Sequence, residues 1–181
     1  MIIRKLSKIR DFLTYEQLRT AVSALIFSRL DYCNSLFFGV SEDLLSKMQC
    51  VQNSAARLVK GKNKCFRGST AEFIQSCNWL RVRERIVFKI ALLVHKCLYG
   101  IAPNCLKKML VYAGSQRTMK LKQATYSLSY GSRSFRRMAP KIWNLLPIKI
   151  RCESDVMNFK KQLKTFLFDG FAMFEKKLKE V

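Results

Sequence analysis

NWLRVRERIVFKIALLVHKCLYGIAP, residues 78–103, carries the strongest structural signal in the chain. Its apolar residues recur at helical spacing and fall within one arc of a helical wheel, namely Val82, Ile86, Ile90, Leu93, Val94 and Cys97. The adjoining arc is basic and carries Arg81, Arg85, Lys89 and Lys96. Gly100 suits a left-handed cap after the last turn, and Pro103 cannot continue a helix. The stretch therefore predicts one long amphipathic helix with a basic stripe.

The charge of the whole chain gives that stripe a context. The 181 residues contain 34 Lys and Arg against 12 Asp and Glu, a net charge of +22. Between Glu84 and Glu153 there is no acidic residue, while fourteen Lys or Arg occur there. A solvated face explains a basic stripe on most helices, but a field of this size favours an anionic partner. Nucleic acid is the first candidate, and an anionic membrane surface or an acidic protein is the alternative.

Helical periodicity also dominates the rest of the chain, and we predict a mostly α fold. It would be a helical bundle of about five to six helices with a short irregular or β-hairpin segment near residues 113–134. Thr14 and Gln17 fit a capping box at the start of a helix that would run to about Phe38. After Gly39, a second helix would run from Ser41 to Gly61 and pack against the first as an antiparallel hairpin.

Further helices are expected around residues 71–77 and 104–112, and from Ser154 to Phe168. Residues 135–147, FRRMAPKIWNLLP, predict a compact aromatic segment with two prolines. Three sections follow from this pattern and should form one structural unit. They are the helical hairpin of residues 1–61, the basic loop and central helix of 62–112, and the basic segment, aromatic segment and C-terminal helix of 113–181.

Several classes of protein lack support in the sequence. The seven cysteines include no C-x-x-C pair, and the single histidine, His95, has no such pair beside it, so we expect neither a zinc site nor any other cofactor. Scattered thiols indicate a reducing compartment, and we expect an intracellular protein, cytoplasmic or nuclear. No apolar run reaches the roughly 18 residues of a membrane span, so none is expected.

Six polar or aromatic residues have a structural or a functional interpretation. Trp79 and Trp143 are expected in the core, with base stacking as the alternative. His95 is expected to be structural. Asp31 and Asn34 are likewise expected to be structural, with polar ligation as the alternative, and Asn144 is expected to orient the turn before Pro147.

Six ordered blocks of sequence resemble one known region. They are LDYCNSLFFG (30–39), LLSKMQCVQNSAARLV (44–59), NWLRVRERIVFKI (78–90), LYGIAP (98–103), SRSFRRMAPKIWNLLP (132–147) and FKKQLKTFLF (159–168). Together they resemble the segment that follows the reverse-transcriptase palm in jockey-like and related non-LTR (LINE-type) retrotransposons. The chain departs from the usual pattern of that family at Asn78, Arg81 and Cys105.

The resemblance implies a thumb-like helical region followed by a C-terminal extension, with the catalytic palm upstream. The five aspartates of this chain are never adjacent, so its own residues do not assemble a two-metal phosphoryl-transfer site. We therefore expect a non-catalytic fragment that holds template RNA or an RNA–DNA hybrid through phosphates, with the palm as a further partner. Were an in-frame palm encoded upstream, the chain would be part of an active polymerase.

The residues predicted to contact nucleic acid are all basic and lie on the stripe, in loops or near the aromatic segment. They are Lys62, Lys64, Arg67, Arg81, Arg85, Lys89, Lys96, Arg117, Lys120, Lys122, Arg133, Arg136 and Arg137. For the residues in loops, plain solvation is an equal alternative. No catalytic or metal-binding residue is predicted.

Overall fold

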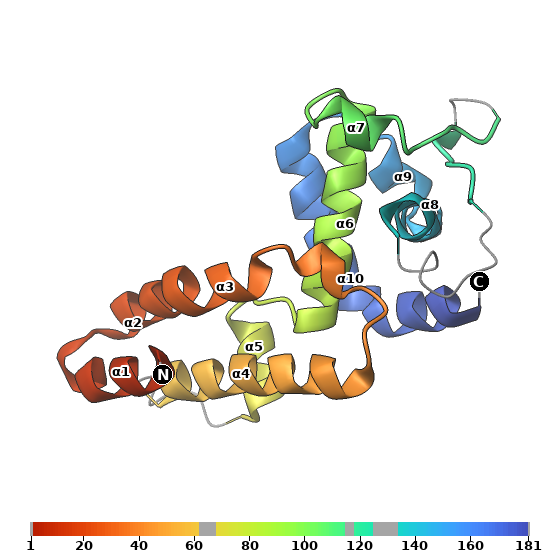
Figure 1. The fold of residues 1–181 in the computed structure, drawn as a ribbon. Helices are drawn as coiled ribbons and strands as arrows, with labels where there is room; N and C mark the ends of the chain where they lie inside the picture. The colour runs from red at the N-terminus through yellow and green to blue at the C-terminus, as the bar shows by residue number, and fades with distance from the viewer. Residues whose placement is uncertain (1, 62–67, 115–117, 125–133, 181) are drawn as a thin grey trace. The chain divides into compact units, whose positions relative to one another are not determined.

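The computed structural model describes residues 2–61, 68–114, 118–124 and 134–180, and among these the fold is mostly α-helical (Figure 1). Contacts divide the chain into two compact units. Unit 1 comprises Met1–Asn34 and Val40–Arg85, and unit 2 comprises Ser35–Gly39 and Ile86–Val181. The three sections within one structural unit that the sequence predicted stay a prediction. The long central helix contributes its first turn to unit 1 and its remainder to unit 2.

The helices confirm the predicted class and are more numerous than the five to six expected, because several are single turns. They are α1 (Ile2–Ile9), α2 (Tyr15–Val22), α3 (Ser28–Asp31), α4 (Glu42–Lys60), α5 (Thr70–Ser76), α6 (Val82–Leu98), α7 (Asn104–Lys107), α8 (Phe135–Leu145), α9 (Ile148–Arg151) and α10 (Val156–Glu180).

The capping box that begins α2 is confirmed, since the Thr14 side chain accepts from the Gln17 N–H and the Gln17 side chain accepts from the Thr14 N–H. A π-helical turn, Ser23–Phe27, joins α2 to α3. The prediction of an unbroken helix to about Phe38 is wrong. The helix ends at Asp31 because Cys33 adopts a left-handed conformation, with φ of 50°, that an α-helix cannot include.

In unit 1, α5 ends in a way that the sequence reasoning missed. Asn78 is left-handed, with φ of 57°; its N–H donates to the Gln75 carbonyl and the Trp79 N–H donates to the Ile74 carbonyl. This pattern is a Schellman motif, and Asn tolerates the left-handed position better than most residues. Residues 78 and 79 therefore close α5, and the long helix α6 begins only at Val82.

The predicted central helix is confirmed as α6. Its start is stabilised by side chains, because the Gln49 amide oxygen accepts from the Val82 N–H and the Glu84 carboxylate accepts from the Arg81 N–H. Its end has the predicted glycine cap: Gly100 has φ of 75°, and the Ile101 N–H donates to the Lys96 carbonyl at 2.8 Å. Most of the predicted apolar face is buried.

Unit 2 is centred on stacked rings. Trp143 of α8 and Phe159 of α10 are fully buried with centroids 5.8 Å apart, and the imidazole of His95 stacks on Phe159 at 4.1 Å. The segment predicted as a compact aromatic–proline region is a regular helix, α8, that continues through Pro140. α10 extends past the predicted end at Phe168 to Glu180.

For the segment near residues 113–134, predicted to be irregular or a β-hairpin, the described residues show one isolated antiparallel bridge, between Tyr112 and Leu121. No longer strand forms in the described part of the chain. Residues 125–133, on which much of that prediction rests, lie outside the described residues.

Candidate nucleic-acid interface

The excess positive charge is concentrated in unit 2. Its residues include 19 Lys and Arg against five Asp and Glu, whereas unit 1 has 15 against seven. Even if each acidic residue of unit 2 neutralised one basic residue, most of its cations would still require solvent or an anionic partner. Unit 2 is therefore where a polyanion would be attracted most strongly.

The extended segment of residues 120–122 presents two of the predicted lysines. Leu121 is 1% exposed, while Lys120 and Lys122 on either side of it are exposed. On one edge, the Lys122 N–H donates to the Val111 carbonyl at 2.7 Å, and the Ala113 N–H donates to the Lys120 carbonyl at 2.9 Å. The alternation of a strand thus buries one side chain and leaves the two ammonium groups in solvent.

The other edge of this segment is held by a side chain of α8. The Asn144 amide oxygen accepts from the Leu121 N–H at 2.9 Å, and its amide nitrogen donates to the Leu121 carbonyl at 2.7 Å. The side-chain amide therefore satisfies the backbone as a neighbouring strand would. Asn144 does this instead of orienting the turn before Pro147, as the sequence had suggested.

Trp143 fixes the residue where this segment begins. Its indole Nε1–H donates to the Met119 carbonyl at 2.7 Å, and Met119 is left-handed with φ of 49°. A left-handed conformation is uncommon for a residue other than Gly, Asn or Asp, and it persists where its surroundings hold it. The buried Trp143 and the half-buried Asn144 of α8 thus hold the backbone that carries Lys120 and Lys122.

The first turn of α8 carries Arg136 and Arg137 and no acidic residue. Arg136 is exposed and Arg137 is half-buried. Partial burial lowers the pKa of Lys141, one turn further along, and the nearby charge of Arg137 lowers that pKa further. Positive side chains at a helix N-terminus are repelled by the positive end of the helix dipole, so an anion bound there would stabilise the helix.

The predicted basic stripe on α6 is divided between the two units. Arg81 lies in unit 1 and is exposed; Lys89 and Lys96 lie in unit 2 and are half-buried. These three residues stay candidates for phosphate contact.

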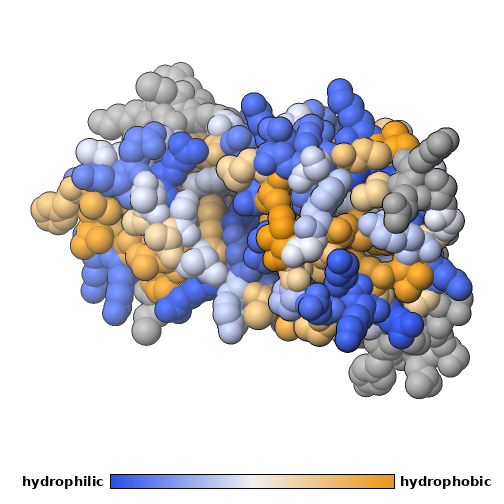
Figure 2. All heavy atoms as spheres, turned by 90° about the horizontal axis from the view of Figure 1, so that it is seen from above, coloured by the Kyte–Doolittle hydropathy of each residue, from blue (hydrophilic) through white to orange (hydrophobic). Residues whose placement is uncertain are grey.

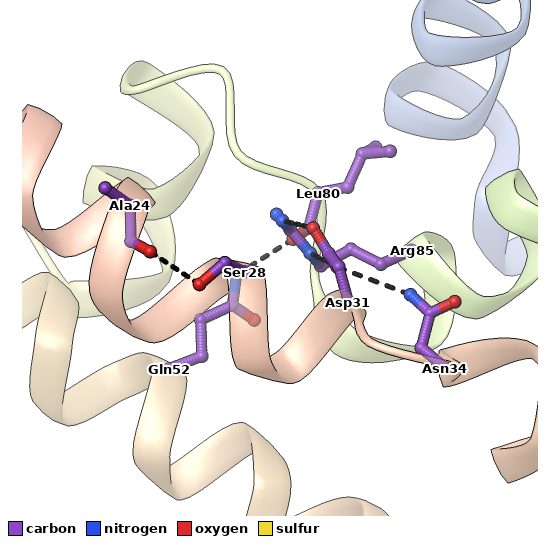
Figure 3. A network of polar contacts seen from close by, with 7 residues as sticks. All are labelled: Ala24, Ser28, Asp31, Asn34, Gln52, Leu80 and Arg85. Atoms are coloured by element: carbon purple, nitrogen blue, oxygen red, sulfur yellow. Dashed lines mark hydrogen bonds and ion pairs between the residues drawn. The ribbon is translucent and has the colours of Figure 1, made fainter.

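Arg85, in contrast, is removed from the candidate interface. Its Nε donates to the Asp31 carboxylate at 2.7 Å, a second guanidinium nitrogen binds the other carboxylate oxygen, and its side chain is 17% exposed (Figure 3). The guanidinium also lies 4.7 Å from the centroid of the Phe27 ring. A bidentate partner within unit 1 already occupies the donors that a phosphate would need, which favours a structural role for Arg85 over the predicted phosphate contact.

The same network explains two polar residues of the LDYCN block. Asn34, 2% exposed, donates from its amide to Asp31, and Gln52 on α4, fully buried, donates to the Leu80 carbonyl at 2.8 Å (Figure 3). The structural interpretation of Asp31 and Asn34 is therefore confirmed. Asp31 and Gln52 each join segments of unit 1 that are distant in sequence, and Asn34 supports Asp31 locally.

The remaining predicted site residues lie outside the described residues. They are Lys62, Lys64, Arg67, Arg117 and Arg133.

Both tryptophans are core residues, as predicted. Trp79 is 7% exposed and meets Phe27 edge to face at 4.6 Å; Trp143 is fully buried. Neither ring is available to stack on a base.

Two buried ionisable residues of unit 2 stand apart from the predicted site. His95 is fully buried; its Nε2 lies 2.8 Å from the Glu153 carbonyl, so this nitrogen carries the proton, and burial lowers its pKa. Arg151 is 5% exposed, and neither its Nε nor its Nη1 has a hydrogen-bond partner in the structure. Burial lowers the pKa of Arg151 also. The sequence motif around Arg151, IKIRC, predicted no such burial.

Hydrophobic side chains are less informative about a binding surface. Figure 2 shows hydrophobic residues, in orange, scattered among hydrophilic ones on one face of the molecule. Large exposed side chains occur in both units, for example Phe12 at 87% and Met173 at 72%. They single out neither unit, whereas the charge does.

The described residues contain neither a cluster of metal ligands nor a helix that could span a membrane. No group of three or more His, Cys, Asp or Glu side chains lies close enough there to hold a metal ion. No helix in the described ranges has both the length and the apolar character needed to cross a membrane.

The chain matches no protein-family model, no curated protein and no solved structure.

Proposed function

We propose that this chain is a non-catalytic nucleic-acid-binding fragment, similar to the region after the palm of a non-LTR retrotransposon polymerase. It would hold template RNA or an RNA–DNA hybrid through phosphate contacts, within the cytoplasm or nucleus. In this proposal the helices of residues 1–61 are the thumb-like part, and a palm in a longer parent protein would be their partner. The chain itself would supply no catalytic residue.

One observation carries the proposal, namely the charge of unit 2. With 19 basic residues against five acidic ones, most of its cations have no acidic residue of their own unit to pair with. Exposed members of this set lie on defined elements, such as Lys120 and Lys122 on the bridged segment and Arg136 on α8. Binding through them would neutralise phosphates and release counterions, without reading the sequence of the bases.

A salt titration tests the proposal. With about six phosphates neutralised, the slope of log K against log salt is expected to be about −5 for duplex DNA. Fluorescence anisotropy of a labelled duplex, measured on the full chain between about 50 and 200 mM salt, gives this slope. A slope near zero would contradict the proposal.

A competition experiment separates nucleic acid from the alternative partners. Structured RNA, single-stranded DNA and vesicles of anionic lipid are compared at matched salt. We expect both nucleic acids to bind more tightly than the vesicles. Preference for the vesicles would instead support a basic helical module for an anionic membrane surface.

A further inference from the structure

We propose that Lys120 and Lys122 form a pre-organised phosphate-binding pair, and that Asn144 and Trp143 are the residues that position it. This inference rests on the proposed function and identifies the part of unit 2 that contacts the nucleic-acid backbone. It follows from how residues 119–122 are held, which differs from an ordinary basic loop.

The pair has the geometry of a short strand. The Leu121 backbone donates one hydrogen bond to the Asn144 side chain and accepts one from it. On the other edge, Lys122 bonds to residue 111 and Lys120 to residue 113. Leu121 itself is 1% exposed and anchors the segment in the core of unit 2. Side chains two residues apart on a strand point to the same face, so Lys120 and Lys122 project together, away from Leu121.

The spacing suits a polyanion. A rise of about 3.3 Å per residue separates the two lysine Cα atoms by about 6.6 Å along the strand. Phosphates of a single nucleic-acid strand advance by about 3.4 Å each along the helix axis, so the pair spans about two of these steps. No acidic residue lies within 30 residues of either lysine in the sequence to compete for them.

The backbone that carries the two lysines is already ordered before a ligand binds. A phosphate-binding residue on a mobile loop must be ordered when it binds, and this costs conformational entropy. Here the left-handed Met119, the Trp143 indole bonded to its carbonyl and the Asn144 amide hold the backbone before any ligand arrives.

The test uses variants of the full chain in which pairs of basic residues are replaced by glutamine. Lys120→Gln with Lys122→Gln removes two positive charges from unit 2, and Arg4→Gln with Lys5→Gln removes two exposed ones from α1 in unit 1. We expect the first variant to make the salt slope on duplex DNA shallower by about 1.8, because two phosphate contacts are lost. The matched control should keep the slope of the unmodified protein.

Asn144→Ala tests the positioning. A merely structural role would lower the fraction of active protein and leave the slope unchanged, whereas lost positioning makes the slope shallower. In the Lys120→Gln, Lys122→Gln background, Asn144→Ala should then change the slope no further. Should Asn144→Ala fail to fold, as judged by helical circular dichroism, Trp143→Phe removes the hydrogen bond to Met119 while a smaller ring stays buried, and its salt slope then carries the test.

The outcomes are distinguishable. If the unmodified chain shows no salt-dependent binding, the proposed function fails. If it binds and the Lys120/Lys122 variant changes the slope no more than the Arg4/Lys5 control, only the inference fails. If the lysine pair matters but the effect of Asn144→Ala is additive with it, the positioning role is overturned.

Discussion

Units 1 and 2 differ in how much of their positive charge has an acidic residue nearby. In unit 1, several basic side chains pair with acidic ones, Arg85 with Asp31, Arg83 with Glu42, and Lys47 with Asp43, although its 15 basic residues still outnumber its seven acidic ones. In unit 2, the stretch from Ile86 to Cys152 contains no acidic residue. The comparison teaches that the net charge of the whole chain is divided unevenly. The larger excess within unit 2 is what favours this unit as the proposed binding surface.

The two units are also alike in one respect, because each has a single buried tryptophan. Trp79 packs edge to face with Phe27 and Phe73 in unit 1, and Trp143 lies beside Phe159 in unit 2. The chain contains no other tryptophan. Replacing one therefore leaves a fluorescent reporter in the other unit.

The largest expected effect comes from Trp143→Ala and Trp79→Ala. Each should lower the free energy of unfolding by about 3–5 kcal/mol, because each leaves a cavity in a packed core. In Trp143→Ala, we expect Trp79 emission to show that unit 1 stays folded at urea concentrations where circular dichroism already reports loss of helix. Coincident transitions in both variants would mean that the units unfold as one.

Two arginines with opposite surroundings give an intermediate effect. Arg85→Met should lower the free energy of unfolding by about 2 kcal/mol, because it leaves the Asp31 carboxylate without its bidentate partner. Arg151→Met should raise it by about 1–2 kcal/mol, because an apolar side chain replaces a buried cation without partners for two of its nitrogens. Urea unfolding measures both. A loss of stability in Arg151→Met would show that its guanidinium is satisfied in solution.

The smallest effect concerns pH and His95. Burial lowers the pKa of its imidazole below the ordinary value of 6.5, so the unfolded chain binds this proton more readily than the folded one. The contribution of the neutral His95 side chain to the free energy of unfolding is therefore fully present above pH 6.5. It is lost as pH falls from 6.5 through the lowered pKa of the folded state. His95 is the only histidine, so NMR of its ring should show a single titration below pH 6.5. In His95→Gln, the decline in stability over that range should be reduced.

The helical class and several helix ends were predictable because they depend on neighbours within a few residues. The capping box of Thr14 and Gln17 and the glycine cap of α6 are examples. The end of the helix at Asp31 was not predictable, because the residue that is left-handed there, Cys33, is not a glycine. The candidate site was predictable only as a set of basic residues, and sequence spacing could not separate the paired from the unpaired ones.

Local sequence by itself determined the amphipathic pattern of residues 78–103 and the acid-free stretch that follows, because periodicity and charge are properties of adjacent residues. Only the tertiary structure decided what the polar side chains do. Asp31 and Arg85 are 54 residues apart, and Asn144 and Leu121 are 23 apart. Such pairs form when packing brings distant segments together and buried polar groups must find partners. For that reason Arg85 stabilises unit 1, while Lys120 and Lys122 are left to face solvent.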